Sequence, residues 1–467
     1  MTVLVQDTPM NLNVPLGHKF LLALCFFPLF MSNLVYGQST QKILTGKVLY
    51  TNGLVTLVGK KTPLRIIGKE QLIYSGDRIA TGLNSKAIIK LLDGTQISLV
   101  EKSEFLISQF SIEKKKEQLE LQLFRGGIRA VSGFINKFSS NKVSLLTPKG
   151  QVAVRGTDFT AFICAKSCVD EGGKQGRSFK SIESLVKGRL IFKQGNIKAR
   201  ASNGQIRNLF DTSPLYSGDI ISSEQEATMV AVFRDDTRVT LNPDSVFQVG
   251  NYQYRPDQDG ENYAAFKLLR GSIRFLSGDI ARFEQANYLL SVPGYNLSLI
   301  DAGIDLGVSD FSHISIWHGK VNFTFADQSL AMLQGNSFLI PGNADKPLEV
   351  REFPGNYNLG PKPNSQKFND SIKTKKLFAT QVVENKTGLF LYVKSGEIEA
   401  QKGSLALNLG SEEAGYVGDN SVYRMEQLPD FLIEQFLDPR VDQKMLERLN
   451  LLPDLNIADP QGPICEI

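Results

Sequence analysis

The chain has 467 residues, of which 52 are Lys or Arg and 48 are Asp or Glu, so its formal net charge is only +4. Hydrophobic residues make up 42% and charged residues 21%, which is a globular composition and excludes a disordered chain. The length predicts two to four domains. So small a net charge argues against nucleic acid as a partner.

The first 37 residues have the pattern of a secretory signal peptide. His18 and Lys19 precede an apolar run over residues 20–31, and Val35-Tyr36-Gly37 then forms a candidate cleavage site. The apolar run is shorter than the ~20 residues that a spanning helix needs. We therefore expect residues 1–37 to be a signal peptide and the mature chain to be exported; retention as an N-terminal anchor is the alternative.

Internal repetition is the strongest signal in the mature chain. Residues 74–77 (YSGD) recur at 216–219, an offset of 142 that also relates Gly46 to Gly188 and Asp93 to Asp235. After three inserted residues the offset becomes 145. A shorter unit, apolar-Gly-charged-apolar, occurs at residues 45–48, 187–190, 318–321 and 395–398. We expect one repeat over residues 38–182, a degenerate second repeat over 183–345, and a partial third over 377–424.

The local pattern inside the repeats is that of short β-strands. Residues 86–92 and 95–100 have the alternating pattern of β-strands. They lie on either side of Asp93-Gly94, a pair that favours a tight hairpin turn. The second copy has Asp235-Asp236 at this turn. Such short strands, bounded by Gly, Asn and Asp, predict an all-β fold built from tandem, elongated, solenoid-like repeats.

Cysteine and histidine are too sparse for a metal centre. Outside residues 1–37 the chain has Cys164, Cys168 and Cys465, with His313 and His318 as its histidines. Cys164 and Cys168 are predicted to pair across a short loop in an oxidising compartment, with two free thiols as the alternative. No metal site and no cofactor are predicted.

Two later segments depart from the repeat pattern. Residues 346–376 are rich in Pro, Gly, Asn and Lys and are interpreted as a linker. Apolar residues recur at helical spacing beyond Pro429, and Pro439 divides them. We therefore expect a short α-helical tail over residues 425–467, either packed on the repeats or docking a partner.

The motifs of the first repeat resemble those of the FecR domain family. They are residues 75–82 (SGDRIATG), 93–95 (DGT), 123–129 (LFRGGIR) and 154–159 (VRGTDF), in the order of the family. The second copy keeps residues 269–274 (LRGSIR) but has LIDAGI at 299–304 in place of VRGTDF. The resemblance implies a β-rich extracytoplasmic domain of a bacterial envelope, periplasmic or on the outer side, and not an enzyme.

The same motifs supply the candidate site residues. Arg125, Arg129, Arg155 and Asp158 are candidates for partner binding, because guanidinium forks suit carboxylate or phosphate. Bracing the strands by pairing with Asp77, Asp93 or Asp158 is the alternative. The residues expected to shape turns are Gly76, Asp77, Gly94, Gly126, Gly156, Gly218 and Gly271.

Catalysis is not indicated by the sequence. It contains no GxSxG elbow, P-loop, HExxH or dinucleotide-binding fingerprint. Residues 111–114, 139–141 and 386–388 reproduce the SxxK, SxN and KTG patterns in order, but Ser111 lies between strand-like runs and not at the start of a buried helix.

The charge is distributed unevenly along the chain. Residues 38–210 contain 29 basic and 12 acidic residues, residues 211–424 contain 19 and 26, and residues 425–467 contain 3 and 9. A basic first repeat is thus joined to an acidic remainder, which would attract an anionic partner or favour head-to-tail self-association. We expect a non-catalytic exported protein that binds an envelope protein or an anionic envelope polymer. The alternatives are a periplasmic signalling accessory and an envelope-structural, peptidoglycan-associated protein.

Overall fold

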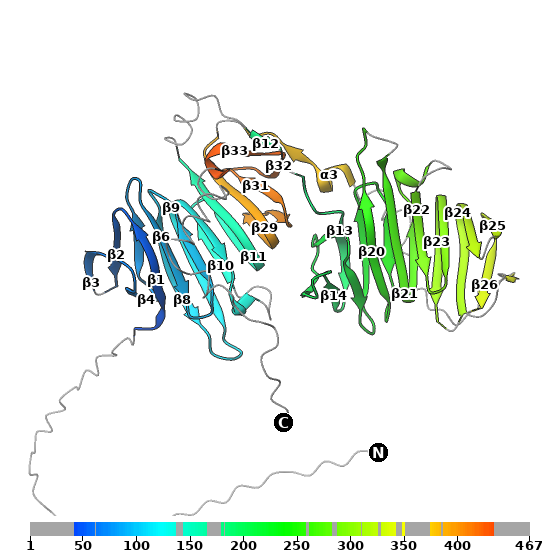
Figure 1. Ribbon diagram of the computed structural model, residues 1–467, viewed down its shortest axis with the longest axis horizontal. Coiled ribbons are helices and arrows are strands. Elements are labelled where there is room, and N and C mark those ends of the chain that lie inside the picture. The colour runs from blue at the N-terminus through cyan, green and yellow to red at the C-terminus, as the bar shows by residue number, and fades with distance from the viewer. Residues whose placement is uncertain are drawn as a thin grey trace, which may run out of the picture. The chain divides into compact units, whose positions relative to one another are not determined.

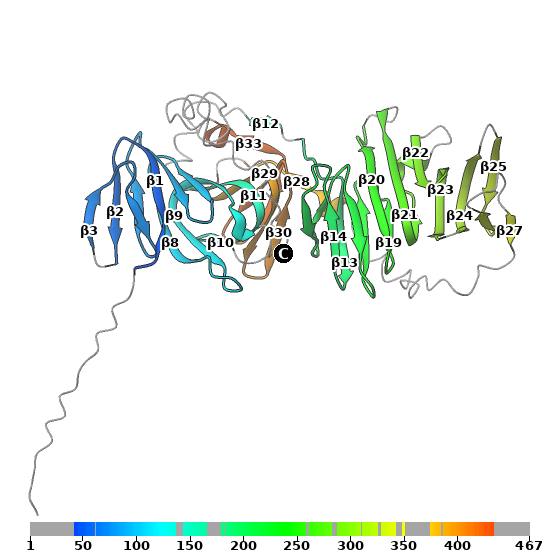
Figure 2. The ribbon, with the colours of Figure 1, turned by 60° about the horizontal axis from the view of Figure 1, so that its bottom comes forward.

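The computed structural model describes residues 42–60, 62–136, 143–165, 179–181, 183–257, 261–282, 287–309, 311–325, 328–341, 348–350, 374–383 and 386–433. Nearly all regular structure in these ranges is β, and it forms two large sheets (Figures 1 and 2). The all-β prediction is confirmed. None of the helices within these ranges is long and apolar enough to cross a membrane.

The first sheet combines residues from both ends of the described chain. Its strands are β1 (Leu44–Asn52), β2 (Val55–Gly59), β3 (Thr62–Ile66), β4 (Leu72–Tyr74), β5 (Arg78–Thr81), β6 (Lys86–Leu91), β7 (Gln96–Leu99), β8 (Glu104–Ser111), β9 (Gln118–Val131), β10 (Val143–Thr147), β11 (Gly150–Cys164), β28 (Thr380–Gln381), β29 (Gly388–Lys402), β30 (Leu405–Leu409), β31 (Glu413–Val417) and β32 (Val422–Met425).

The second sheet takes the residues between those two stretches. Its strands are β13 (Gly188–Gln194), β14 (Ile197–Arg200), β15 (Ile206–Asn208), β16 (Pro214–Leu215), β17 (Ile220–Ser223), β18 (Thr228–Phe233), β19 (Arg238–Leu241), β20 (Val246–Gln253), β21 (Tyr263–Leu276), β22 (Asn287–Val292), β23 (Tyr295–Val308), β24 (Phe311–Phe325), β25 (Gln328–Leu333), β26 (Ser337–Pro341) and β27 (Leu348–Val350).

The remaining regular elements are short. They are the paired strands β12 (Phe179–Ser181) and β33 (Gln427–Pro429), the 3-10 turns η1 (Phe134–Asn136) and η3 (Asp279–Arg282), and the helices α3 (Thr374–Phe378) and α4 (Asp430–Leu432).

Both sheets fold back on themselves at a bend in a long strand. The first half of β9 pairs with β8, and the second half pairs with β7 and β11. In the second sheet β21 pairs in the same way with β20, β19 and β23. Each sheet thereby encloses one apolar core between its two halves. The hairpin predicted about Asp93-Gly94 is present as β6 and β7.

A glycine and a serine make the bend in each repeat. Gly126 has a φ of 73°, and a Cβ there would lie 2.5 Å from the Cα of Ser103. The buried Ser103 hydroxyl accepts a hydrogen bond from the amide of Gly127 at 2.9 Å. Gly271 and Ser245 repeat the arrangement in the second sheet. The offsets of 142 and 145 therefore describe a duplicated backbone.

Residues 377–424, expected to form a partial third repeat, pair with the first sheet. β29 lies antiparallel to β11 along its length, from Gln401 opposite Gln151 to Gly388 opposite Cys164. Figure 1 shows the orange β29 beside the cyan-green β11. β24 pairs with β23 in the same way in the second sheet. The apolar-Gly-charged unit at 395–398 is therefore the first-sheet equivalent of residues 318–321.

Several predicted segments lie partly or wholly outside the described residues. Residues 1–37, Cys168 and Cys465 are outside them, so the signal peptide stays a prediction. The expected linker, 346–376, contributes β27 and the start of α3. In the expected helical tail, Met425 ends β32, residues 427–429 form β33, and α4 begins at Asp430.

Candidate functional site at the junction of the two sheets

The arginine of the LFRGGIR motif pairs with the aspartate of the VRGTDF motif. Arg129 donates from Nε and Nη2 to the two carboxylate oxygens of Asp158, both at 2.9 Å. In the second sheet, Arg274 makes the same fork to Asp305 at 2.7 Å. Asp305 lies two residues beyond the position that corresponds to Asp158 by the offset of 145. The second copy therefore keeps this brace although its VRGTDF segment has changed.

Arg155 is committed to contacts within the protein. Its Nη1 donates to Glu397 and its Nη2 to Glu399, each at 2.6 Å, and its guanidinium lies 4.5 Å from the ring centre of Phe210. Glu397 is buried and also accepts hydrogen bonds from Asn408 and, across the junction, from Ser213 of the second sheet. Arg155 therefore connects the first sheet to the second.

Arg125 is the one of the four candidate partner-binding residues that lies largely in solvent. Its side chain is 63% exposed, and its Nε lies 3.1 Å from Glu104. Glu104 also accepts a hydrogen bond from Arg78, whose guanidinium stacks 4.3 Å from the ring centre of Phe124. Arg125 thus belongs to an outer face, whereas Arg129, Arg155 and Asp158 are held internally.

The predicted turn residues act through backbone geometry and short hydrogen bonds. The six glycines among them all have positive φ angles: Gly76, Gly94, Gly126, Gly156, Gly218 and Gly271. Asp77 accepts a hydrogen bond from the amide of Tyr74 at 3.0 Å. Cys164 is disulfide-bonded. Because Cys164 is the only cysteine within the described ranges, its pairing with Cys168 stays a prediction.

A second buried cluster joins the sheets around Glu413. The fully buried Arg189 of β13 hydrogen-bonds to the Glu413 carboxylate of β31. Arg424 lies 3.6 Å and Arg234 4.0 Å from the same carboxylate. Burial alone would raise the pKa of Glu413, but Arg189 and Arg424 outweigh it and lower the pKa to about 2. Glu413 is therefore ionised at every physiological pH.

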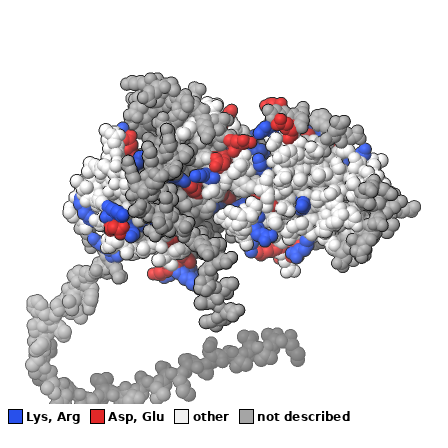
Figure 3. All heavy atoms as spheres, viewed as in Figure 1, with Lys and Arg blue, Asp and Glu red and all other residues white. Residues whose placement is uncertain are grey.

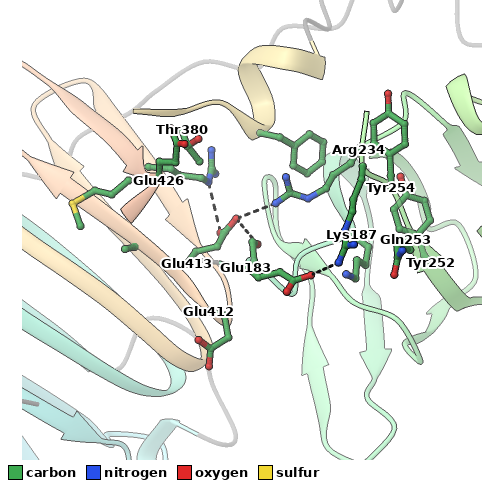
Figure 4. Close-up of a pocket in the computed structure, with 16 residues that line it drawn as sticks. Glu183, Lys187, Arg234, Tyr252, Gln253, Tyr254, Thr380, Glu412, Glu413 and Glu426 are labelled. Atoms are coloured by element: carbon green, nitrogen blue, oxygen red, sulfur yellow. Dashed lines mark hydrogen bonds and ion pairs between the residues drawn. The ribbon is translucent and has the colours of Figure 1, made fainter. Parts of the chain in front are cut away.

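A pocket of about 480 Å³ opens beside this cluster (Figure 4). Lys187, Arg234, Tyr252 and Tyr254 line it from strands of the second sheet or residues that flank them, and the lining on the other side comes from α3, β28, β31, β32 and residues next to them. On the face that Figure 3 shows, charged side chains gather where the two sheets meet, and most of the second sheet is uncharged.

Apart from Arg155, the junction residues were missed by sequence reasoning, although one pattern contained two of them. Arg189 and Glu397 are the charged members of the apolar-Gly-charged units at 187–190 and 395–398. That pattern indicates a turn followed by a strand and does not tell which charge becomes buried. Within the described ranges, no cluster of three or more His, Cys, Asp or Glu side chains is placed to hold a metal ion.

Comparison with known proteins finds a family match within the first repeat. Residues 77–178 match the family model described as FecR protein, which confirms the resemblance over this stretch. Two crystal structures of a proposed anti-sigma factor from Parabacteroides distasonis are similar to this chain with 12% identity and a TM-score of 0.24. Each similarity covers 41% of this chain, and it covers 99% of the chain in one crystal structure and 98% in the other. No curated protein matches the chain.

Proposed function

We propose that this chain is a non-catalytic, exported binding protein that acts as an accessory in envelope signalling, and that it binds an acidic protein partner through the outer face of its first repeat. The observation that carries the proposal is the FecR match at residues 77–178, which includes Arg78, Glu104 and Arg125 of this face. The signal-peptide pattern at residues 1–37 supports export.

The outer face is a continuous row of side chains across five strands. Strand register places Ile66 opposite Thr56, Thr56 opposite Ala80, Ala80 opposite Glu104, and Glu104 opposite Arg125. Residues opposite each other in a sheet point to the same side, so Ile66 and Arg125 lie at the two ends of one face. We call this the β3–β9 face.

The β3–β9 face combines exposed apolar side chains with basic ones. Leu64 and Ile66 of the edge strand β3 are 67% and 73% exposed. The edge leaves one side of β3 unpaired among the described strands, a feature that suits addition of a partner strand. Arg78 and Arg125 share the single carboxylate of Glu104, which leaves a positive excess on this face, in a segment with a net charge of +17 over residues 38–210.

This combination favours a protein over an anionic polymer as partner. A polyanion gains from basic side chains but gains nothing from apolar ones, whereas a protein interface typically centres on apolar anchors with a charged rim. The basic rim favours a partner with an acidic surface, because complementary charge accelerates association.

Affinity capture with the mature chain tests the proposal. We expect the double substitution Leu64→Asp and Ile66→Asp to abolish capture of a defined partner from envelope extract, since both side chains are exposed and folding should be unaffected. Ile206→Asp is the matched control, because Ile206 is 61% exposed at the equivalent place in the second repeat. Equal capture by all three proteins, or capture of a glycan alone, would contradict the proposed partner face.

A further inference from the structure

The buried base of the junction pocket holds more cations than carboxylates. Arg189, Arg234 and Arg424 all lie within 4.0 Å of the Glu413 carboxylate. Three arginines therefore surround one buried carboxylate, and Lys187 adds a further cation to the lining. The other lining carboxylates, Glu183, Glu412 and Glu426, are partly or fully exposed, and Glu183 lies 3.6 Å from Arg255, another lining residue.

Two buried donors at this base, Nε of Arg189 and Nε of Arg424, have no hydrogen-bond acceptor among the described residues. Arg234 donates from Nε to the carbonyl of Val186, stacks its guanidinium 4.9 Å from the ring centre of Phe378, and has Nη2 4.0 Å from Glu413. The buried Nε of Arg424 also donates no hydrogen bond, although it lies 3.6 Å from Glu413. Buried donors without acceptors are costly, so an added acceptor would be stabilising here.

The electrostatics of the base agree with the geometry. Burial lowers the pKa of Lys187; the charge of Arg234 lowers it further, and that of Glu183 opposes the change. Burial lowers the pKa of Arg234; the charge of Glu413 raises it, and that of Arg189 lowers it. Each cation therefore has a like-charged neighbour as well as a carboxylate, and an added anion would reduce the repulsion between the cations.

We propose that this pocket binds a small molecule with one carboxylate and a short apolar body. A single carboxylate matches the fork of Arg234 and the ammonium of Lys187. The ring of Phe378 and the side chain of Met425 supply apolar walls. A volume of about 480 Å³ lies within the range of small-molecule sites. Glu412, Glu413 and Glu426 would repel a more highly charged anion.

Such a ligand would bridge the two sheets. Lys187 and Arg234 flank strands β13 and β18 of the second sheet, whereas Phe378 lies in α3 and Met425 in β32 of the first. This inference rests on the proposed binding function and deepens it: the pocket would report a small carboxylate to the partner through the junction.

Saturation-transfer NMR of the mature chain with benzoate, and with benzamide as its neutral isostere, tests the proposal. We expect benzoate to bind at least about tenfold more tightly than benzamide. Lys187→Gln should weaken benzoate binding by about tenfold, because a charge-assisted contact is lost. Lys187→Arg should restore binding. Lys198→Gln is the control, because the side chain of Lys198 in β14 is 45% exposed and pairs with the exposed Glu224.

Three outcomes would overturn the carboxylate site: equal affinity for benzoate and benzamide, no effect of Lys187→Gln on benzoate, or inorganic phosphate binding more tightly than benzoate. Partner capture by Lys187→Gln, measured in parallel without added ligand, separates this failure from failure of the proposed function. Capture lost with Leu64→Asp and Ile66→Asp but kept with Lys187→Gln supports the partner face independently of the pocket.

Discussion

The two repeats share one backbone design and use the same sequence position in opposite ways. Lys47 and Arg189 both follow the glycine of an apolar-Gly-charged unit. Lys47 is exposed and bonds to the exposed Glu70 at 2.8 Å, whereas Arg189 is fully buried against Glu413. The difference arises because the second sheet places this strand end against residues that return to the first sheet. The position in the repeat thus determines the backbone conformation, and contact with the other sheet determines whether the charged side chain is buried.

Removing the charge of Glu413 is expected to have the largest effect. Glu413→Gln leaves Arg189 buried without a counter-ion, which we expect to lower the free energy of unfolding by about 3–5 kcal/mol. The matched change Glu70→Gln removes the solvent-exposed partner of Lys47 and should leave the free energy of unfolding nearly unchanged. Urea unfolding of both variants measures the contrast; similar losses would mean that burial of Arg189 does not govern its contribution.

The Glu413 cluster also predicts a specific pH dependence. The pKa of Glu413 is lowered from 4.5 to about 2 in the folded protein. Its contribution to stability is therefore fully present above pH 4.5 and is lost as the pH falls toward 2. Unfolding curves of the wild type and of Glu413→Gln should converge over this window. A gap that stays constant down to pH 2 would contradict the assignment.

The bends of the paired long strands should tolerate no side chain in either sheet. Gly396 of β29 and Gly319 of β24 have φ angles of 90° and 67°, and a Cβ would lie 2.0 and 1.8 Å from the carbonyl oxygens of Gly156 and Asp301. We expect Gly396→Ala and Gly319→Ala each to cost at least about 2 kcal/mol. Gly403→Ala, with φ of 59° but open space, is the control for backbone conformation alone. A cost of Gly403→Ala equal to the others would remove the steric argument.

The turn at residues 93–95 and its counterpart at 235–237 differ in their hydrogen bonds. We expect a smaller change in the free energy of unfolding there. In the second sheet, Tyr252 donates to Asp235 at 2.9 Å and Tyr288 lies 2.5 Å from the Thr237 hydroxyl. We expect Tyr288→Phe to cost about 1 kcal/mol, the value of one buried hydrogen bond. The corresponding residue of the first repeat is the buried Val143, so Val143→Ala reports packing at this place without a hydroxyl. No loss of stability in Tyr288→Phe would show that the hydroxyl contributes nothing there.

The fold could be predicted from local patterns because the repeats are built from local rules. Alternation about Asp93-Gly94 predicted the β6–β7 hairpin, and the offsets of 142 and 145 predicted that Gly126 and Gly271 are equivalent. The return of residues 388–425 to the first sheet could not be predicted in this way, because pairing between β11 and β29 joins residues more than 200 positions apart. Repetition indicates which segments are alike and not which sheet they join.

The same limit applies to the candidate site. Arg129 and Asp158 are partner-binding candidates in the sequence, with pairing of the motif arginines to Asp77, Asp93 or Asp158 as the alternative, and the structure pairs Arg129 with Asp158. Arg155 was expected either to bind a partner or to pair with an aspartate nearby, and it lies instead on Glu397 and Glu399 of the returning strand. A buried ion pair between distant segments leaves no periodic trace in a single sequence. Only the tertiary pairing of β11 with β29 brings these charges together.

The central claim, that the β3–β9 face of the first repeat binds a protein, is tested most directly by site-specific photocross-linking in the native envelope. A photoreactive residue is placed at Leu64 in one protein and at Ile206, its equivalent in the second repeat, in the other. The account predicts a discrete protein adduct from position 64 that disappears when Arg78 and Arg125 are changed to Glu, and no such adduct from position 206. Equal adducts from both positions, or none from position 64 while the partner is still captured, would contradict it.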